Sequence, residues 1–314
     1  MDIQIIEILR NKIKENLSKV IFGKDHVLDM VVMAVICNGH ILIEDVPGTG
    51  KTILARSLAK SLGVDFSRIQ FTPDMLPSDI TGVSIFNQAK KEFEFRKGPL
   101  FANIILADEI NRATPKTQSA LLEAMEEKQI TVDGVTYQLP EYFQVVATQN
   151  PIEYEGTFSL PEAQLDRFLI RIRIGYPEPK VEQNILESQK YEHPFKTLSQ
   201  SAGLEELAAS QAQIKNVIVS EKIRKYIIDI LQRTRKDADI YLGSSIRGGL
   251  ALYRLGQCEA VFSGRDYVIP DDIKKIAPQA LSHRIIFRSA IQSQEFDQEE
   301  YISEMIQTVR VPGG

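Results

Sequence analysis

The sequence predicts an α/β protein with a five-stranded parallel sheet and inserted β-hairpins, followed by a smaller all-helical domain. Two observations carry the main division. Five short apolar runs, of the kind found in buried parallel strands, alternate with helical segments in the first half of the chain. The composition changes at about residue 177, where a charged, linker-like helix and then a polar stretch reach residue 202, and beyond residue 202 the apolar spacing is helical throughout. The length of 314 residues is enough for roughly two domains.

The elements are expected in a regular order. Helical spacing over residues 1–20 and 25–38 precedes a first strand at residues 41–43. The other strands are expected at residues 67–71, 104–107, 143–148 and 168–174, with helices between them that include 53–62 and 116–127. Later helices are expected at residues 204–212, 220–236, 246–262 and 270–281. The predicted domains are residues 1–176, a linker at 177–202, and a helical domain at 203–314.

Two segments interrupt this rhythm. Residues 84–97 alternate apolar and polar side chains around a charged turn, and residues 129–139 do so around Asp133 and Gly134, a strong two-residue hairpin signal. We expect both to be β-hairpins inserted into the α/β frame. They either engage a substrate or only widen the sheet, and the pattern of either one alone favours neither.

A phosphate-binding loop is expected directly after the first strand. Gly48 and Gly50 let the backbone turn its N–H groups inward, Lys51 can reach the β- and γ-phosphates of a nucleotide, and the Thr52 hydroxyl can ligate Mg²⁺. The candidate nucleotide-binding residues here are Asp45, Val46, Pro47, Gly48, Thr49, Gly50, Lys51, Thr52 and Ile53. Asp45 stands where the strict G-x-x-x-x-G-K-[ST] pattern has its first glycine, so the prediction depends on context. An ordinary strand–turn–helix connection is the alternative.

Candidates for hydrolysis follow the next strands. Asp108 ends an apolar strand and can hold Mg²⁺ through water, while Glu109 can polarise the attacking water. The alternative for such a pair is a helix cap, which a preceding phosphate loop makes less favourable. Asn150 follows the fourth strand and is the candidate for orienting the water, or it is an Asn-Pro turn former.

Two arginines are candidates for contacts to phosphate. Arg167 either pairs with a local acid such as Asp166 or projects into a neighbouring subunit's nucleotide as an arginine finger. Three other arginines compete for the finger role: Arg112, Arg171 and Arg173. Arg247, at a helix start among small residues, can reach the γ-phosphate across the cleft between the domains and report hydrolysis as lid movement.

These residues lie within sequence blocks that resemble one family over nearly the whole chain. The blocks are GH at residues 39–40, FTPDMLPSDITG at 71–82, GPLFAN at 98–103, ADEINRA at 107–113, PKTQ at 115–118, EAMEE at 123–127, ATQNP at 147–151, LPEAQLDRF at 160–168 and GRDYV at 264–268. They resemble the MoxR family of AAA+ ATPases, in the superclade shared with magnesium chelatase.

The resemblance implies an AAA+ module with a five-stranded parallel sheet, a helical lid and ring assembly, usually hexameric. It also implies roles: Lys51 and Thr52 in Walker A, Asp108 and Glu109 in Walker B, Asn150 at sensor 1, Arg167 at the finger and Arg247 at sensor 2. The two hairpins fall where the superclade carries its helix-2 and pre-sensor-1 insertions, which favours their acting on substrate.

The sequence departs from the family pattern at three places. Asp45 replaces the first loop glycine, although residues 47–50 still make a tight turn. Ile246 stands where proline often precedes the sensor-2 arginine, which leaves the placement of Arg247 open. Residues 22–24 replace a frequent Gly-Gln pair near the expected adenine site, where Val20 and Ile21 are expected as apolar walls.

The sequence-based hypothesis is an ATPase that uses ATP and Mg²⁺, hydrolyses the β–γ phosphoanhydride, and remodels or activates partner proteins as a ring with shared sites. The resemblance suggests partners with von Willebrand factor A domains and a client protein that the chain does not identify. The alternative is a nucleotide-gated scaffold with little turnover. A nucleic-acid motor is less favoured, because the net charge is −5 and residues 129–139 contain no lysine or arginine.

A cytoplasmic protein without membrane insertion is expected. The first residues lack a basic segment, and the longest apolar stretch, residues 27–37, contains Asp29 and is too short to span a bilayer. Two cysteines lie far apart, Cys37 and Cys258, and each follows an apolar helical pattern. They are expected to be buried free thiols in a reducing compartment.

Overall fold

The computed structural model describes residues 3–151, 157–188, 193–288 and 296–311. Its centre is a five-stranded parallel sheet with the strand order β2-β5-β8-β1-β9. The strands are β1 (Ile41–Glu44), β2 (Phe66–Gln70), β5 (Ile104–Asp108), β8 (Gln144–Gln149) and β9 (Ile170–Ile172). The predicted number and direction of strands are therefore confirmed. Because every strand runs the same way, the sheet has one carboxyl edge and one amino edge.

The sheet separates two hydrophobic cores, because successive side chains of a strand point to opposite faces. Ile41 and Ile43 of β1 join a core with the helices α1, α2 and α3, whereas Leu42 joins a core with α5. These helices are α1 (Gln4–Ser18), α2 (Asp25–Ile36), α3 (Lys51–Leu62) and α5 (Pro115–Glu127). Burial on both faces explains why the strands read as continuous apolar runs in the sequence.

Both predicted hairpins are present, as separate two-stranded sheets outside the central one. They are β3 (Gly82–Asn87) with β4 (Glu92–Lys97), and β6 (Gln129–Val132) with β7 (Val135–Gln138). Asp133 and Gly134 both have positive φ, as a two-residue hairpin turn requires. Phe95 stacks on Tyr137 with ring centroids 4.1 Å apart and so links the two hairpins.

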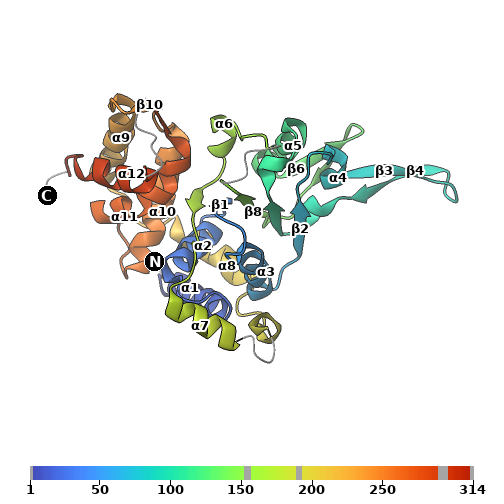
Figure 1. The fold of residues 1–314 in the computed structure, drawn as a ribbon, viewed down its shortest axis with the longest axis horizontal. Helices are drawn as coiled ribbons and strands as arrows, with labels where there is room; N and C mark the ends of the chain where they lie inside the picture. Colours follow the sequence, from blue (N-terminus) through green and yellow to red (C-terminus); the bar gives the residue numbers. More distant parts are fainter. Residues whose placement is uncertain (1–2, 152–156, 189–192, 289–295, 312–314) are drawn as a thin grey trace.

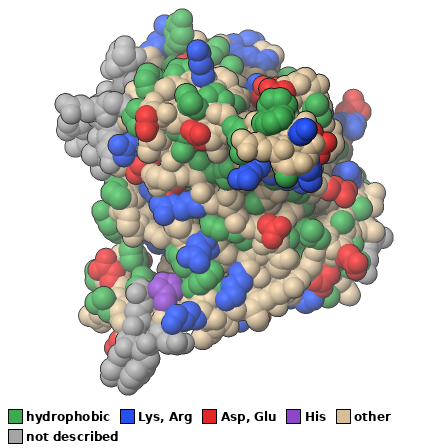
Figure 2. All heavy atoms as spheres, turned by 90° about the vertical axis from the view of Figure 1, so that its right-hand side faces the viewer, with side chains coloured by type: hydrophobic (Ala, Val, Ile, Leu, Met, Phe, Trp, Pro, Cys, Tyr) green, Lys and Arg blue, Asp and Glu red, His purple; other side chains and the backbone are tan. Residues whose placement is uncertain are grey.

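The β3–β4 hairpin projects from one end of the molecule, opposite the C-terminal helices (Figure 1). Its side chains Phe86 and Phe93 are exposed to solvent. Figure 2 looks at this end and shows hydrophobic and basic side chains exposed close together. The hairpin therefore offers an apolar surface that the rest of the described chain does not cover.

The described residues of the C-terminal part form helices and one short strand pair. Its helices are α8 (Leu204–Ile214), α9 (Glu221–Lys236), α10 (Ile246–Phe262), α11 (Pro270–Leu281) and α12 (Gln298–Gln307). The strands β10 (Ile240–Leu242) and β11 (Ile286–Phe287) pair antiparallel, which the sequence did not predict because each run is too short to show a period. Helix α8 belongs to the predicted helical domain, but it packs against α1 and α2 of the predicted first domain. The division into domains at residues 176 and 203 therefore stays a prediction.

The remaining elements are short and connect the larger ones: α4 (Pro77–Thr81), η1 (Pro99–Phe101), η2 (Ile110–Arg112), α6 (Glu162–Leu165), α7 (Pro179–Ser188), η3 (Pro194–Thr197) and η4 (Ser282–Arg284). In the described part of the chain, none of the helices is long and apolar enough to cross a membrane.

His40 anchors the amino end of β1 inside the protein. Its Nε2 lies 3.1 Å from the carbonyl oxygen of Met125, and its Nδ1 accepts a hydrogen bond of 3.0 Å from the Val145 N–H. This pairing uses the neutral ring, with the proton on Nε2. Burial is the main reason that the pKa of His40 is lowered to about 4.

We expect His40 to make the protein less stable in mild acid. The folded state holds the ring neutral, whereas the unfolded state protonates it near the ordinary pKa of about 6.5. The stability that depends on the neutral ring is thus present above that value and is lost as the pH falls towards 4. Between about pH 7 and about pH 5 the loss should be roughly 2 kcal/mol in the free energy of unfolding.

Urea unfolding over that pH range measures this loss. His40→Gln should have a flatter pH dependence than the wild type, whatever its absolute stability. His26→Gln, at an exposed histidine, is the matched control. Parallel pH curves for wild type and His40→Gln would contradict the assignment.

Candidate functional site

The loop between β1 and α3 has the backbone of a phosphate-binding loop. Gly48 and Gly50 have φ angles of 85° and 90°, a left-handed region that favours glycine. A Cβ atom built at Gly48 would meet no heavy atom within 4 Å, so the loop leaves open space there. Lys51 begins α3, and its Nζ donates to the carbonyl oxygens of Asp45 at 2.6 Å and Val46 at 2.9 Å. The loop and its lysine thus form one compact unit at the helix start.

Asp45 connects this loop to the end of β9. Its Oδ2 accepts hydrogen bonds from the N–H groups of Ile174 at 2.8 Å and Gly175 at 2.7 Å, and its Oδ1 accepts from Val46 N–H at 2.8 Å. The residue is buried. A carboxylate at this position therefore satisfies buried backbone donors, which a glycine could not do.

A cleft of about 430 Å³ lies between the loop and the carboxyl edge of the sheet. The loop contributes Pro47, Gly48, Gly50, Lys51, Thr52 and Ile53, and the strand ends contribute Arg68, Gln70, Asp108, Glu109, Thr148 and Asn150. Asp45 and Val46 do not line the cleft. The structure therefore brings together Lys51, Thr52, Asp108, Glu109 and Asn150, which are distant in sequence, around one space.

Asp108 is buried at the end of β5 and fixed through both oxygens. Its Oδ1 accepts a hydrogen bond of 2.6 Å from the Thr148 hydroxyl, and its Oδ2 accepts from Arg68 Nη2 at 2.7 Å. Carboxylate and hydroxyl oxygens are the ligands that Mg²⁺ prefers, so Asp108 and Thr52 fit a magnesium site. Arg68 faces the same cleft and balances the charge of Asp108.

Glu109 has a strained backbone and a held side chain. Its φ angle is 57°, a left-handed conformation that typically costs about 1–3 kcal/mol for a residue other than glycine and clusters at functional sites. Its N–H donates to Thr148 Oγ1 at 2.9 Å. Its Oε2 accepts from Gln70 Nε2 at 2.7 Å and from Arg112 Nη1 at 3.2 Å. The carboxylate is thereby fixed at the wall of the cleft.

A second pocket, of about 270 Å³, adjoins this cleft. The two spaces share Gly48, Gly50 and Ile53, so they lie on two sides of the same loop residues. Val20 and Ile21, the expected apolar walls for a base, line the second pocket together with Thr49, Ile174 and Pro177. This pocket is therefore lined by the chain before α2, the phosphate loop and the chain after β9.

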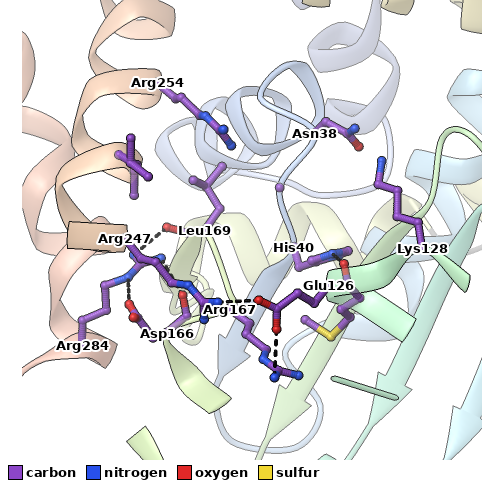
Figure 3. A pocket seen from close by; sticks show the side chains of 14 residues that line it. Asn38, His40, Glu126, Lys128, Asp166, Arg167, Leu169, Arg247, Arg254 and Arg284 are labelled. Carbon is purple, nitrogen blue, oxygen red and sulfur yellow. Dashed lines mark hydrogen bonds and ion pairs between the residues drawn. The ribbon is translucent and has the colours of Figure 1, made fainter. Parts of the chain in front are cut away.

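Arg167 and Arg247 lie at the opposite edge of the sheet. Arg167 precedes β9, and His40, which precedes β1, lines the same pocket of about 250 Å³ as both arginines (Figure 3). Both guanidinium groups pair with Glu126: Arg167 Nη2 lies 2.9 Å from Oε2, and Arg247 Nη2 lies 2.5 Å from Oε1. Neither arginine is among the residues that line the phosphate cleft. The structure thus separates them from the loop of their own chain.

The competing arginines have other surroundings. Arg171 is buried and lies 3.0 Å from Glu44, which Arg173 also approaches, at 3.5 Å. Burial lowers the pKa of Arg171, and Glu44 opposes that shift. Arg112 pairs with Glu109 of its own chain. Of the four candidates, Arg167 alone lies in the pocket shared with Arg247.

Sequence reasoning missed four residues of these sites: Arg68, Gln70, Thr148 and Glu126. Arg68 and Gln70 are two apart at the end of β2, so they point to the same face and reach the same cleft. That spacing was a usable signal for the first two. Thr148 and Glu126 gave no such signal, because their partners come from other elements.

A phosphate loop at the carboxyl edge of this sheet, followed by a helical lid, defines an ATPase of the AAA+ class. Residues 40–170 match the family model "ATPase family associated with various cellular activities (AAA)", and residues 232–304 match "AAA lid domain". The sequence is 39% identical to Chaperone MoxR1 of Mycobacterium tuberculosis, over 94% of this chain and 80% of that protein. The chain belongs to the MoxR family of AAA+ ATPases.

Two further relatives match over nearly their whole length. YeaC of Bacillus subtilis is 49% identical over 97% of this chain and 95% of that protein. A crystal structure of a candidate ATPase from Cytophaga hutchinsonii superimposes with a TM-score of 0.88 at 38% identity, covering 99% of this chain and 98% of the other. The fold is therefore the same from end to end in that protein.

Asp45→Ala should destabilise the protein through the end of β9. The change leaves the N–H groups of Ile174 and Gly175 without their acceptor, so we expect the free energy of unfolding to fall by about 2–4 kcal/mol. Urea denaturation measures this. Asp65→Ala, at an exposed aspartate, is the control and should change the stability by less than about 0.5 kcal/mol. Equal stabilities for the two variants would contradict a structural role for Asp45.

Proposed function

We propose that the chain binds ATP in the cleft and hydrolyses the bond between its β- and γ-phosphates. The observation that supports this most is the convergence of Lys51, Thr52, Asp108 and Glu109 on one space. The loop N–H groups and Lys51 hold the phosphates. Thr52 and Asp108 hold Mg²⁺, which when bound neutralises charge on the phosphate oxygens.

Glu109 is the general base of the proposed reaction. Hydrogen bonds from Gln70 and Arg112 restrict its carboxylate, so it can accept a proton from water without first reorganising. Asn150 lies at the same wall and orients that water. Val20 and Ile21 contact the base of the nucleotide from the adjoining pocket.

We infer that Arg167 and Arg247 act on the nucleotide of a neighbouring subunit. A parallel sheet holds its phosphate cleft at one edge, whereas these arginines precede β9 and begin α10 at the other. A ring in which the amino edge of each subunit faces the cleft of the next supplies positive charge to every site. A hexamer is the expected form of such a ring.

ATP hydrolysis then drives work on other proteins in the cytoplasm. The relative named Chaperone MoxR1 supports a chaperone-like activity. The projecting β3–β4 hairpin, with Phe86 and Phe93 exposed, is a candidate surface for a client, and partners with von Willebrand factor A domains are part of the proposal. No lysine or arginine lies on β6 or β7, which supports a protein client over a nucleic acid.

Glu109→Gln should abolish turnover and keep nucleotide binding. Removing the base should lower kcat about 10²–10⁴-fold, because the amide cannot accept the proton. ATPase rates and ATP affinity are measured over a dilution series, with Glu123→Gln, an exposed residue of α5, as control.

Turnover per chain should fall on dilution if sites are shared. Wild-type protein without turnover at any concentration would favour a nucleotide-gated scaffold, and full activity of Glu109→Gln would overturn the proposed chemistry.

A further inference from the structure

Glu126 is the meeting point of three separate segments of the chain. It lies in the last turn of α5, Arg167 follows α6, and Arg247 lies in the first turn of α10. Each carboxylate oxygen of Glu126 pairs with one guanidinium group: Oε2 pairs with Arg167, and Oε1 pairs with Arg247 (Figure 3). A single side chain therefore contacts both arginines.

Asp166, which lines the same pocket as Glu126, holds the start of α10 in place. Its Oδ2 accepts a hydrogen bond of 2.7 Å from the Ser245 hydroxyl, directly before α10, and its Oδ1 accepts from Arg284 Nε at 2.8 Å. Arg284 is buried and also donates to backbone carbonyls of the chain before β9. The base of α10 is thus rigidly held, which leaves the direction of the Arg247 side chain to Glu126.

The contacts of Glu126 are exchangeable. Its side chain is 36% exposed, and those of Arg167 and Arg247 are 28% and 45% exposed. Ion pairs of this kind contribute little to stability, because water and salt screen them. Each guanidinium group also has five N–H donors, so it can bind a phosphate oxygen through one edge while another edge stays paired with Glu126.

We propose that Glu126 is a positioning residue that holds Arg167 and Arg247 together at the spacing needed to grip the phosphates of the neighbouring subunit's ATP. This rests on the proposed function. Glu126 belongs to the subunit that donates the arginines, so its loss should impair the neighbour's site and leave its own phosphate cleft intact. That separation makes the role distinguishable from a general structural one.

Glu126→Gln should lower kcat about 10–100-fold, the range for a misplaced catalytic group, while ATP affinity changes less than about threefold. Glu127→Gln is the matched control, because it removes the same charge one residue further along the same helix, also at an exposed position. Equal thermal midpoints for the two variants exclude unfolding as the cause. Wild-type kcat in Glu126→Gln, or an equal loss in Glu127→Gln, would overturn the positioning role.

Mixing two impaired variants tests the action between subunits. Glu126→Gln has an intact cleft and misplaced arginines, whereas Lys51→Ala has intact arginines and a defective cleft. Mixed assemblies contain interfaces where the cleft of the first meets the arginines of the second, so turnover should reappear on mixing. Mixing can fail to restore turnover even though Glu109→Gln and dilution lower turnover as expected. In that case the positioning role of Glu126 is wrong, while the proposed ATPase function stands. Wild-type protein without turnover would overturn the proposed function and this role with it.

A separate observation concerns the two cysteines of the chain, which lie 221 positions apart in sequence. Their Sγ atoms are 3.6 Å apart, and both are free thiols. Cys37 caps α2, and Cys258 lies within α10, the helix that begins with Ile246 and Arg247. Cys258 is buried as the sequence predicted, but Cys37 is only half-buried, so Cys37 is the more exposed residue of the pair.

We propose that this pair is a redox-sensitive tie between α2 and α10. Glutathione disulfide can react with the more exposed Cys37 thiol, forming a mixed disulfide and releasing one glutathione thiol. The Cys258 thiol then loses its proton and attacks the Cys37 sulfur as the thiolate, which breaks the mixed disulfide and releases the second glutathione, whose sulfur takes up a proton. The protein loses two electrons and two protons in total, and the oxidant gains them. The resulting bond fixes α10 to α2 and restrains the helix that carries Arg247.

Thiol titration after treatment with glutathione disulfide tests this tie. Free thiols should fall from two to none per chain, and mass spectrometry should find one internal disulfide and no retained glutathione. The ATPase rate should fall as the thiols are lost. Dithiothreitol should restore both the thiols and the ATPase rate. Cys258→Ser is the control and should retain glutathione on Cys37 without the internal bond. Two free thiols after oxidation, or a stable mixed disulfide in the wild type, would overturn the proposal.

Discussion

The parallel direction of the five strands is the constraint on which the rest of the structure depends. Each strand leaves the sheet at the carboxyl edge, so the loop after β1 and the side chains that end β2, β5 and β8 meet there without further guidance. The amino edge collects a different set, including His40 before β1 and Arg167 before β9. One protein molecule therefore carries two separate groups of candidate functional residues, on opposite edges of the sheet.

Carboxylate side chains make several of the contacts that join these parts of the protein. Asp45 joins the phosphate loop to the end of β9, Asp108 is held by Thr148 and Arg68, and Glu126 gathers two arginines from different elements. The first is buried and serves the fold, whereas the last is partly exposed and serves a surface that faces outward. A carboxylate contact therefore stabilises the fold where it is buried, and it remains exchangeable where water reaches it.

The predictions from sequence were most accurate where the signal was local. Strand runs buried on both faces, the hairpin turn at Asp133 and Gly134, and the shared family blocks gave the fold class correctly. Contacts that join distant segments were out of reach. The sequence raised Asp45 as an irregular loop residue, but its partners at Ile174 and Gly175 lie about 130 positions away. The roles of all the candidate site residues, from Lys51 in the loop to Arg247 in α10, remain predictions.

By itself, the sequence determined the α/β class and the family, and it predicted the residues that would hold phosphate and Mg²⁺, because periodicity and loop chemistry are properties of neighbouring residues. The tertiary structure decided where those residues face. It put Glu109 and Asp108 in one cleft with Lys51, moved Arg167 and Arg247 to the far edge on Glu126, and brought Cys37 to Cys258. These facts depend on strand order and helix packing, which pair residues that no local pattern connects.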